Sequence, residues 1–297
     1  MSKPRSTEQR LVEHVDRIAQ EHPPIELGTV DFSVRDPAAM NARFGHVLDY
    51  MARVELEVDR NVLELTTMLP DPPEVDRYFY ADVWHPQEVR HGQILDELQV
   101  RLGRDHAVAD LTTVSAKMHV LGALSHIPPI EDVVRMLYYL TGQATERSAV
   151  LAYNLLHNGL VETGETAAAE TIVAQIKRQE PAHHAFYSMS ARGLDDQLAP
   201  WQRWLVRRLR ALSFAPVGAN NPQQTADFGD LMVTLGIDDD LDRFATAVAR
   251  VEVELIGAAG QGLRVPPYVL KAFRDALEAA HARRGTAGHA PSAAPAP

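Results

Sequence analysis

Apolar residues recur every three or four positions along most of the chain, and no stretch alternates apolar and polar residues as a β-strand does. This helical period predicts an all-α fold. Several of the predicted helices exceed twenty residues and short connections join them, which favours a helical bundle over a solenoid or a globin-like packing. The predicted helices cover residues 37–68, 75–102, 107–124, 130–158, 163–191, 200–212, 225–235, 240–258 and 267–283.

The two ends of the chain depart from this pattern. Residues 1–31 mix charged side chains with Pro23 and Pro24, and residues 284–297 consist largely of alanine and proline. Segments of this kind bury too little apolar surface to pack. We therefore expect a loosely ordered N-terminal segment over residues 1–31, one helical domain over residues 32–283, and a disordered tail over residues 284–297.

Within the first predicted helix, one carboxylate falls on the apolar stripe. Residues at helical spacing on this stripe include Phe44, Leu48, Met51 and Val58, and the same spacing includes Glu55. A carboxylate among apolar residues costs several kcal/mol unless it is paired or binds a metal. Taken alone, Glu55 is better explained by a position near a bundle end, or by pairing with a buried arginine, than by metal binding. The neighbouring charges lie off the stripe and are expected to be solvated: Glu57, Asp59, Arg60 and Glu64.

Two later helices each carry a carboxylate and a histidine three residues apart. Glu88 and His91 project from the same face of one helix, and Glu180 and His183 repeat this spacing. A single Glu-x-x-His pair is more often a surface pair than a metal site. Glu146 lies on an apolar stripe of the helix between them, as Glu55 does in the first helix. The pattern is therefore a duplication.

The number of residues between the two carboxylates of each half is nearly the same, which supports the duplication. The chain advances 33 residues from Glu55 to Glu88 and 34 residues from Glu146 to Glu180. We therefore expect two helical hairpins, related by a rotation of about 180°, that present their ligands at one depth. Four carboxylates and two imidazoles suit two iron ions, or manganese in one of the two positions. Zinc prefers fewer ligands, and calcium does not recruit imidazole. The predicted metal ligands are Glu55, Glu88, His91, Glu146, Glu180 and His183.

Composition narrows the chemistry further. The 297 residues include no cysteine, which excludes disulfides, iron–sulfur clusters and thiol nucleophiles. A net charge of −11 argues against a nucleic-acid partner, which needs a basic face. No apolar run is long enough to span a bilayer, and the first residues lack the apolar core of a signal peptide. We therefore expect a cytoplasmic protein without membrane insertion.

The segment from Trp84 to Gly92 reads Trp-x-x-x-Glu-x-Arg-His-Gly, and Glu146 is followed by Arg147. With these motifs the chain resembles the soluble acyl-acyl carrier protein desaturases, within the ferritin-like di-iron carboxylate superfamily. The likeness covers residues 49–265 and includes the run RALSFAPVGANN followed by DFGDLMVTLGI. The resemblance implies a ferritin-like four-helix bundle with additional C-terminal helices, a homodimer, and two iron ions that react with dioxygen. It also implies electrons from a ferredoxin or reductase, and an acyl chain delivered on acyl carrier protein or another thioester.

Three features depart from the pattern of that family. Gln179 stands where the family has aspartate, Pro181 follows the fourth carboxylate ligand, and Ala149 replaces a threonine. Pro181, like Pro86 near Glu88, is expected either to mark the start of its helix or to cause a kink or π-bulge there.

We expect a dioxygen-dependent oxidoreductase that desaturates an acyl chain. The alternatives are a monooxygenase on a small substrate, acting as a C-hydroxylase or N-oxygenase, and an iron-binding ferritin-like protein without catalysis. A basic run formed by Arg207, Arg208 and Arg210 is a candidate docking surface for an acidic carrier protein. His85 and His184 adjoin the ligands and are expected to lie outside the metal site.

Overall fold

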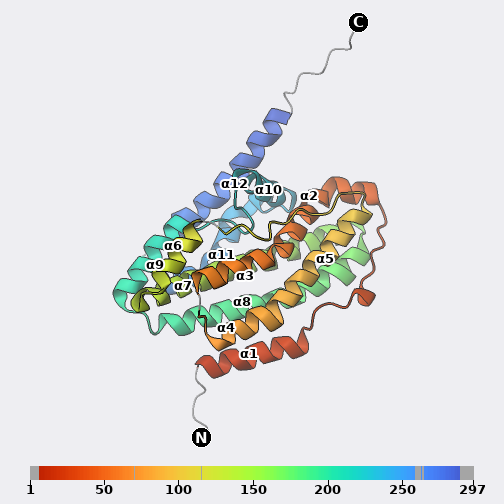
Figure 1. Cartoon of the computed structure of the whole chain (residues 1–297). Coiled ribbons are helices and arrows are strands. Elements are labelled where there is room, and N and C mark those ends of the chain that lie inside the picture. The colour runs from red at the N-terminus through yellow and green to blue at the C-terminus, as the bar shows by residue number, and fades with distance from the viewer. Residues whose placement is uncertain (1–6, 70, 115, 258–261, 263, 288–297) are drawn as a thin grey trace.

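The computed structural model describes residues 7–69, 71–114, 116–257, 262 and 264–287, and all regular structure within them is helical (Figure 1). The all-α prediction is therefore confirmed. No helix among these residues is long and apolar enough to cross a membrane. The helices are α1 (Thr7–Glu21), α2 (Pro37–Leu56), α3 (Val58–Met68), α4 (Glu74–Tyr78), α5 (His85–Arg101), α6 (Ala116–Ser125), α7 (Pro128–Thr163), α8 (Ala174–Asp195), α9 (Pro200–Ser213), α10 (Pro222–Thr234), α11 (Leu241–Ile256) and α12 (Pro267–Ala287), with 3₁₀ turns η1 (Leu27–Thr29) and η4 (Asp238–Asp240) and π-helical turns η2 (Phe79–Trp84) and η3 (Ala168–Val173).

Two pairs of long helices form the centre of the molecule. Helix α2 packs along α5, and α7 packs along α8 (Figure 1). Glycine permits the close approach within each pair, since a Cβ atom at Gly92 of α5 would lie 2.7 Å from Cγ of Leu56. A Cβ atom at Gly142 of α7 would collide with the ring of Tyr187 on α8. Both glycines lie within four residues of a predicted ligand.

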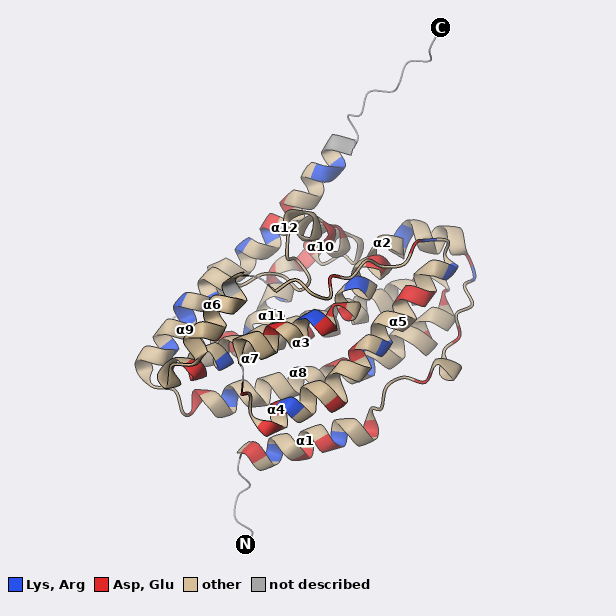
Figure 2. Cartoon of the chain, in the orientation of Figure 1, with Lys and Arg blue, Asp and Glu red and all other residues tan. Residues whose placement is uncertain are grey.

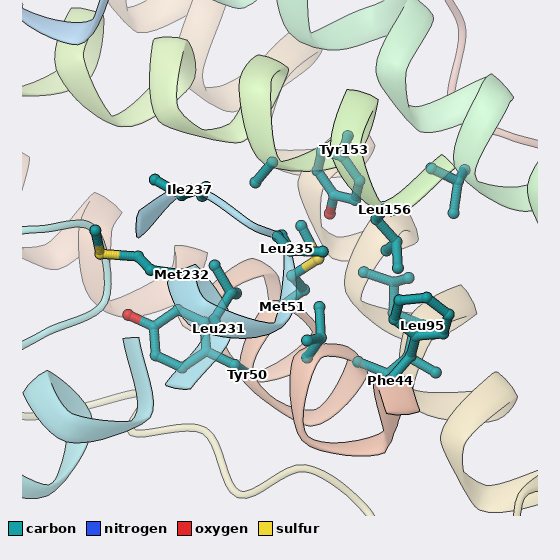
Figure 3. Packing of buried hydrophobic residues seen from close by; sticks show 14 of the residues in the cluster. Phe44, Tyr50, Met51, Leu95, Tyr153, Leu156, Leu231, Met232, Leu235 and Ile237 are labelled. Carbon is teal, nitrogen blue, oxygen red and sulfur yellow. The ribbon is translucent and has the colours of Figure 1, made fainter. Parts of the chain in front are cut away.

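Two apolar clusters fill the space between these helices, one at each end. The first cluster joins α2, α5 and α7 to α10, and Figure 3 shows part of it, including Phe44, Leu95 and Leu231. The second cluster includes Phe79, Tyr139 and Phe186, and lies towards the other ends of α5, α7 and α8. Helices α7 and α8 run from one apolar cluster to the other, and the predicted ligands lie in the short polar layer between the two clusters.

Outer helices cover this centre. Helix α1 packs on α8, α10 packs on α2 and α12, and α9 and α11 pack on α7. Figure 2 shows acidic and basic residues interspersed on these helices. Residues Thr7–Glu21, within the segment expected to be loosely ordered, form α1, because Leu11, Val15 and Ile18 share one face that is buried against the neighbouring helices. The predicted tail is helical as far as Ala287, and from residue 288 on it lies outside the described residues.

The predicted helix over residues 37–68 is interrupted at Glu57, which caps α2 and precedes α3. The prediction that Glu57 and Arg60 are solvated is wrong, since their exposed fractions are 1% and 7%. The Glu57 carboxylate accepts hydrogen bonds of 2.9 Å from Arg53 and 2.8 Å from Arg60. A buried carboxylate between two guanidinium groups fixes the chain where the helix breaks, two residues after Glu55.

The predicted helix over residues 107–124 is also shorter in the structure, because α6 begins at Ala116. In the segment before Ala116, backbone N–H groups donate to side-chain carboxylates and not to the carbonyl groups of a helix. Asp96 accepts a hydrogen bond of 2.7 Å from the backbone N–H of Ala107, and Asp110 accepts 3.1 Å and 3.0 Å bonds from those of Thr112 and Thr113. Such bonds compete with the hydrogen-bonding pattern of a helix.

Neither Pro86 nor Pro181 lies at the start of its helical segment. Pro86 is the second residue of α5, but η2 and α4 precede it without a break, so the chain is helical before it. The π-helical turn η2 ends directly before α5, consistent with the predicted distortion. Pro181 lies inside α8, and the π-helical turn of that segment, η3, ends at Val173.

Candidate metal centre

The structure brings all six predicted ligands together in the polar layer between the two apolar clusters. Helix α2 supplies Glu55, α5 supplies Glu88 and His91, and the second helix pair supplies the other three residues. None of the six is more than 8% exposed. Their ligand atoms form two groups, within each of which the atoms lie no more than 4.8 Å apart: Glu55, Glu88, His91 and Glu180 in one, and Glu88, Glu146, Glu180 and His183 in the other.

The two groups share Glu88 and Glu180, and each adds one further carboxylate and one imidazole. In the first group, Nδ1 of His91 lies 3.4 Å from Oε2 of Glu88 and 3.2 Å from Oε1 of Glu180. In the second, Nδ1 of His183 lies 2.8 Å from Oε1 of Glu88 and 3.9 Å from Oε2 of Glu180. The shared carboxylates therefore lie between the two imidazoles, as ligands that bridge two ions do.

Each histidine is held by a glutamine from the opposite helix pair. Nε2 of His91 donates to the amide oxygen of Gln179 at 2.6 Å, and Nε2 of His183 donates to that of Gln87 at 2.5 Å. An amide oxygen only accepts, so each Nε2 carries a hydrogen. In the neutral imidazole, Nδ1 then has a free lone pair that faces the carboxylates. This is the tautomer that a metal ligand needs.

The glutamines are oriented in turn by one short segment near the N-terminus. The Gln87 amide donates to the carbonyl of His22 at 2.5 Å, and the Gln179 amide donates to that of Pro23 at 2.8 Å. Because the amide nitrogens are bound there, the amide oxygens must point to the histidines. The residues between α1 and η1 thus fix both imidazoles.

The two outer carboxylates each accept a hydrogen bond from a different aromatic residue. The indole of Trp84 donates to Oε1 of Glu146 at 3.2 Å, and the hydroxyl of Tyr153 donates to Oε1 of Glu55. The residue types differ although the two groups have matching side chains, so the two groups are not equivalent. One has an indole beside it and the other has a phenol.

Electrostatics in the cluster favour shared protons between carboxylates. Burial, followed by the negative charge of Glu88, raises the pKa of Glu55 well above its ordinary value. Burial, followed by the charges of Glu88 and Glu180, does the same to the pKa of Glu146. Burial acts to raise the pKa of Glu88 as well, but hydrogen bonds with Glu55 and interactions with His183 hold it well below its ordinary value. Four carboxylates this close cannot all be ionised without cations.

The pKa of His91 is shifted by the same group of carboxylates. Burial acts to lower its pKa, but the close carboxylates of Glu180 and Glu88 raise it well above the ordinary value. The cluster therefore attracts positive charge, either as protons or as cations.

Several buried atoms in the cluster have no hydrogen-bond partner among the described residues. They are Nδ1 of His91, Nδ1 of His183, Oε1 of Glu88 and Oε1 of Glu180. A buried polar atom without a partner is costly, and these four face one another. Carboxylate oxygens and imidazole nitrogens are the donors that iron and manganese accept. The residues present thus fit two metal ions, one in each group.

Comparisons of the chain with protein-family models, with curated proteins and with solved structures find no match.

An aromatic wall closes the side of the cluster next to α4 and η2. The rings of Phe79 and Phe186 stack with centroids 3.7 Å apart, and Phe79 meets the His183 ring edge-on at 6.1 Å. Tyr80 lies 5.6 Å from Trp84, centroid to centroid. Aromatic side chains packed in this way leave little room for water beside the imidazole.

The two histidines that adjoin ligands in the sequence lie outside both groups, as predicted. His85 is partly exposed and pairs with Asp59 at 2.6 Å. His184 lines a separate cavity, where burial, followed by the charges of Arg147 and Arg192, lowers its pKa to about 4.

The prediction that Arg210 belongs to an exposed docking surface is wrong. Arg210 is 2% exposed, and its guanidinium donates to Glu252 at 2.9 Å and to the hydroxyl of Thr141 at 2.9 Å. It is therefore part of a buried ion pair between α9 and α11. Arg207 is half-buried and binds the carbonyl of Ile256, while Arg208 is exposed.

Sequence reasoning missed the residues that hold the ligands in place. Gln87 and Gln179 each directly precede a glutamate ligand, so the repeated motif is Gln-Glu-x-x-His in both halves. This longer repeat was a signal available in the sequence. Nothing in the sequence indicates the role of the His22 and Pro23 carbonyls, because every residue has a backbone carbonyl and the residue type does not show which of them accepts a hydrogen bond.

Proposed function

We propose that this chain is a dioxygen-dependent di-iron oxidoreductase, with a ferritin-like four-helix bundle formed by α2, α5, α7 and α8. The observation that carries the proposal is the convergence of four carboxylates and two correctly oriented imidazoles in a buried layer, with two carboxylates common to both groups. Ferritin-like di-iron carboxylate proteins use this ligand set. The Trp84 to Gly92 motif, which resembles that of the soluble acyl-acyl carrier protein desaturases, supports the same assignment.

Two iron ions held in the cluster would activate dioxygen, which is the oxidant needed to attack an unactivated C–H bond. The chain's own residues do the rest. Glu88 and Glu180 belong to both groups and would hold both ions, and Glu55 and Glu146 would each complete one group. Gln87 and Gln179 keep the imidazoles in the ligating tautomer, and the aromatic wall of Phe79 and Phe186 limits water beside His183.

The reaction that fits the resemblance is desaturation of an acyl chain on acyl carrier protein or another thioester. The substrate loses two hydrogen atoms, and dioxygen with two electrons and two protons from a donor becomes two molecules of water. The chain has no cysteine to hold an iron–sulfur cluster. A ferredoxin or reductase must therefore deliver the electrons, and a homodimer is the assembly that the resemblance implies.

A second candidate, a monooxygenase, is favoured by one residue. Ala149 of α7 stands three residues after Glu146, where the resembling family carries threonine, and its methyl group packs against the first apolar cluster. The hydroxyl that the family places beside the oxygen site is therefore missing from this position, so insertion of oxygen is the reaction to compare with desaturation.

The decisive experiment begins with anaerobic titration of the purified chain with ferrous iron. About two ions per chain should bind, and Glu88→Gln should abolish stoichiometric binding. Glu97→Gln is the matched control, because Glu97 lies on the same helix with its side chain 44% exposed and paired with Arg101. Wild-type binding that Glu88→Gln leaves unchanged would contradict the proposal.

The reaction itself is then tested by exposing the loaded protein to dioxygen, a reductant and acyl-carrier substrates. Mass spectrometry distinguishes loss of two hydrogens, which indicates desaturation, from gain of one oxygen, which indicates the monooxygenase. Oxidation of the iron without change in any acyl, amine or aromatic substrate would instead indicate a non-catalytic iron-binding protein.

A further inference from the structure

A cavity of about 440 Å³ opens between α7, α8 and α11. Arg147 and His184 line it, and they directly follow the ligands Glu146 and His183 in the sequence. Consecutive residues of a helix point in directions about 100° apart. The cavity and the metal cluster therefore use different faces of α7 and α8, and they are separate sites.

Three arginines give the cavity a positive charge. Arg192 and Arg250 both donate to the carboxylate of Glu254, at 2.7 Å and 3.0 Å. Arg147 is half-buried and has no ion-pair partner among the described residues. Three guanidinium groups against one carboxylate leave an excess of two positive charges at a cavity wall, on a chain whose net charge is −11.

The rest of the lining is apolar or neutral. Ala185 and Met189 of α8 and Ala247 and Val251 of α11 contribute apolar surface, and Ser188 contributes a hydroxyl. The volume falls within the range of roughly 300–1,000 Å³ that small-molecule sites occupy. A ligand that complements these walls has an anionic head for the arginines and an apolar body for the remaining surface.

We infer that this cavity binds the phosphate head of an amphiphilic small molecule. Guanidinium groups bind phosphate oxygens through paired hydrogen bonds, and a phosphate monoester dianion matches the excess of two positive charges better than a carboxylate does. The inference requires no metal in the cluster, and it stands independently of the proposed oxidoreductase function.

Binding is measured by isothermal titration calorimetry with n-hexyl phosphate, inorganic phosphate and hexanoate as three separate probes. Hexyl phosphate should bind most tightly, because inorganic phosphate lacks the apolar body and hexanoate carries a single charge. Arg147→Ala and Arg250→Ala should each weaken hexyl phosphate binding at least about tenfold, since each removes a charge-assisted contact. Higher salt should weaken binding as well.

The matched control is Arg178→Ala, which removes the same charge from an exposed position of α8 outside the cavity and should leave the affinity unchanged. The Arg250 side chain is 72% exposed, so its replacement does not endanger folding even where Arg147→Ala does. Absence of hexyl phosphate binding, equal affinity for hexanoate, or equal losses in Arg250→Ala and Arg178→Ala would each overturn the inference.

Discussion

The amide oxygen of Gln87 lies 2.5 Å from Nε2 of His183, although the two residues belong to different helix pairs. Gln179 holds His91 in the reciprocal way at 2.6 Å. Each glutamine thus directly precedes a glutamate ligand of its own helix and orients a histidine ligand of the other pair. The hydrogen bonds cross the layer in both directions and join the two halves of the centre.

Replacing either glutamine should weaken metal binding without removing a ligand. Gln87→Ala or Gln179→Ala leaves Nε2 of one imidazole without its acceptor, and loss of such a partner lowers metal affinity about 10- to 100-fold. Competition with a chelator of known affinity measures the effect. Gln93→Ala, at an exposed position of α5, is the control and should retain wild-type affinity. Equal affinities of all three variants would show that the glutamines do not orient the ligands.

The shared and unshared carboxylates should differ in the number of ions lost. Glu88 and Glu180 belong to both ligand groups, so Glu88→Gln or Glu180→Gln should reduce the bound iron from about two ions per chain to nearly none. Glu55 and Glu146 each belong to one group, so Glu55→Gln or Glu146→Gln should leave about one ion. Iron is counted after gel filtration. Identical losses in all four variants would exclude the assignment of Glu88 and Glu180 as bridging ligands.

Metal binding should release protons. The raised pKa values of Glu55, Glu146 and His91 mean that these groups keep their protons to a higher pH than usual, and a cation must displace those protons. We expect a net release of protons on binding, and an apparent metal affinity that rises with pH because fewer protons then compete. Calorimetry in buffers of different ionisation enthalpy gives the number. A value of zero would mean that the carboxylates are already ionised.

A pH effect on folding is expected at a different site. Asp76 of α4 is 1% exposed and accepts a hydrogen bond of 2.6 Å from the hydroxyl of Tyr139. Burial raises its pKa from 3.8 to about 6. Because the folded-state pKa is the higher one, the stability that protonated Asp76 contributes is complete below pH 3.8 and is lost as the pH rises through about 6.

Asp76→Asn should remove this dependence. Near pH 7 the variant should have a free energy of unfolding higher than wild type by roughly 3 kcal/mol, about two pKa units, and the difference should vanish at low pH. Urea denaturation at a series of pH values measures it. Asp71→Asn is the control, because that carboxylate is 92% exposed and its pairing with Arg77 contributes little. Parallel pH profiles of wild type and Asp76→Asn would contradict the assignment.

The buried ion pairs of Glu57 with Arg53 and Arg60, where α2 ends and α3 begins, should be essential for folding. Glu57→Gln leaves the guanidinium groups of Arg53 and Arg60, both buried, without a counter-charge. Removing one partner from a buried ion pair costs about 3–5 kcal/mol. Thermal unfolding should show a large fall in melting temperature, whereas Glu97→Gln should leave it nearly unchanged. A small effect of Glu57→Gln would mean that water reaches the arginines.

The clustering of the six residues could be predicted from the sequence, because an ionisable residue on an apolar stripe is expected to be buried. Glu55 and Glu146 stand out for that reason, and the two Glu-x-x-His pairs confirm the register. Glu57 could not be interpreted in the same way. Glu57 is buried because the helix breaks there, and the spacing of the apolar residues gives no sign of that break. The spacing alone therefore predicts that Glu57 lies on a solvated face.

Other features depend on contacts between distant segments, which a local pattern does not contain. The predicted helix includes residues 107–114, but Asp96 and Asp110 bind backbone N–H groups there and this segment is not helical. Arg210 was expected at the surface because its neighbours are basic, whereas its partner Glu252 lies on α11. The π-helical turns likewise leave no mark in the spacing of apolar residues that sequence reasoning could use.

The crossed hydrogen bonds also order events during protein synthesis. The first hairpin, with Glu55, Glu88 and His91, leaves the ribosome long before residues 179–183 are translated, and until then Gln87 has no histidine to hold and His91 has no Gln179. A nascent chain therefore presents only half of the ligands, in an orientation that nothing fixes. The proposed metals could be captured in the final geometry only when α8 has emerged and docked, so loading would report that the four central helices have come together.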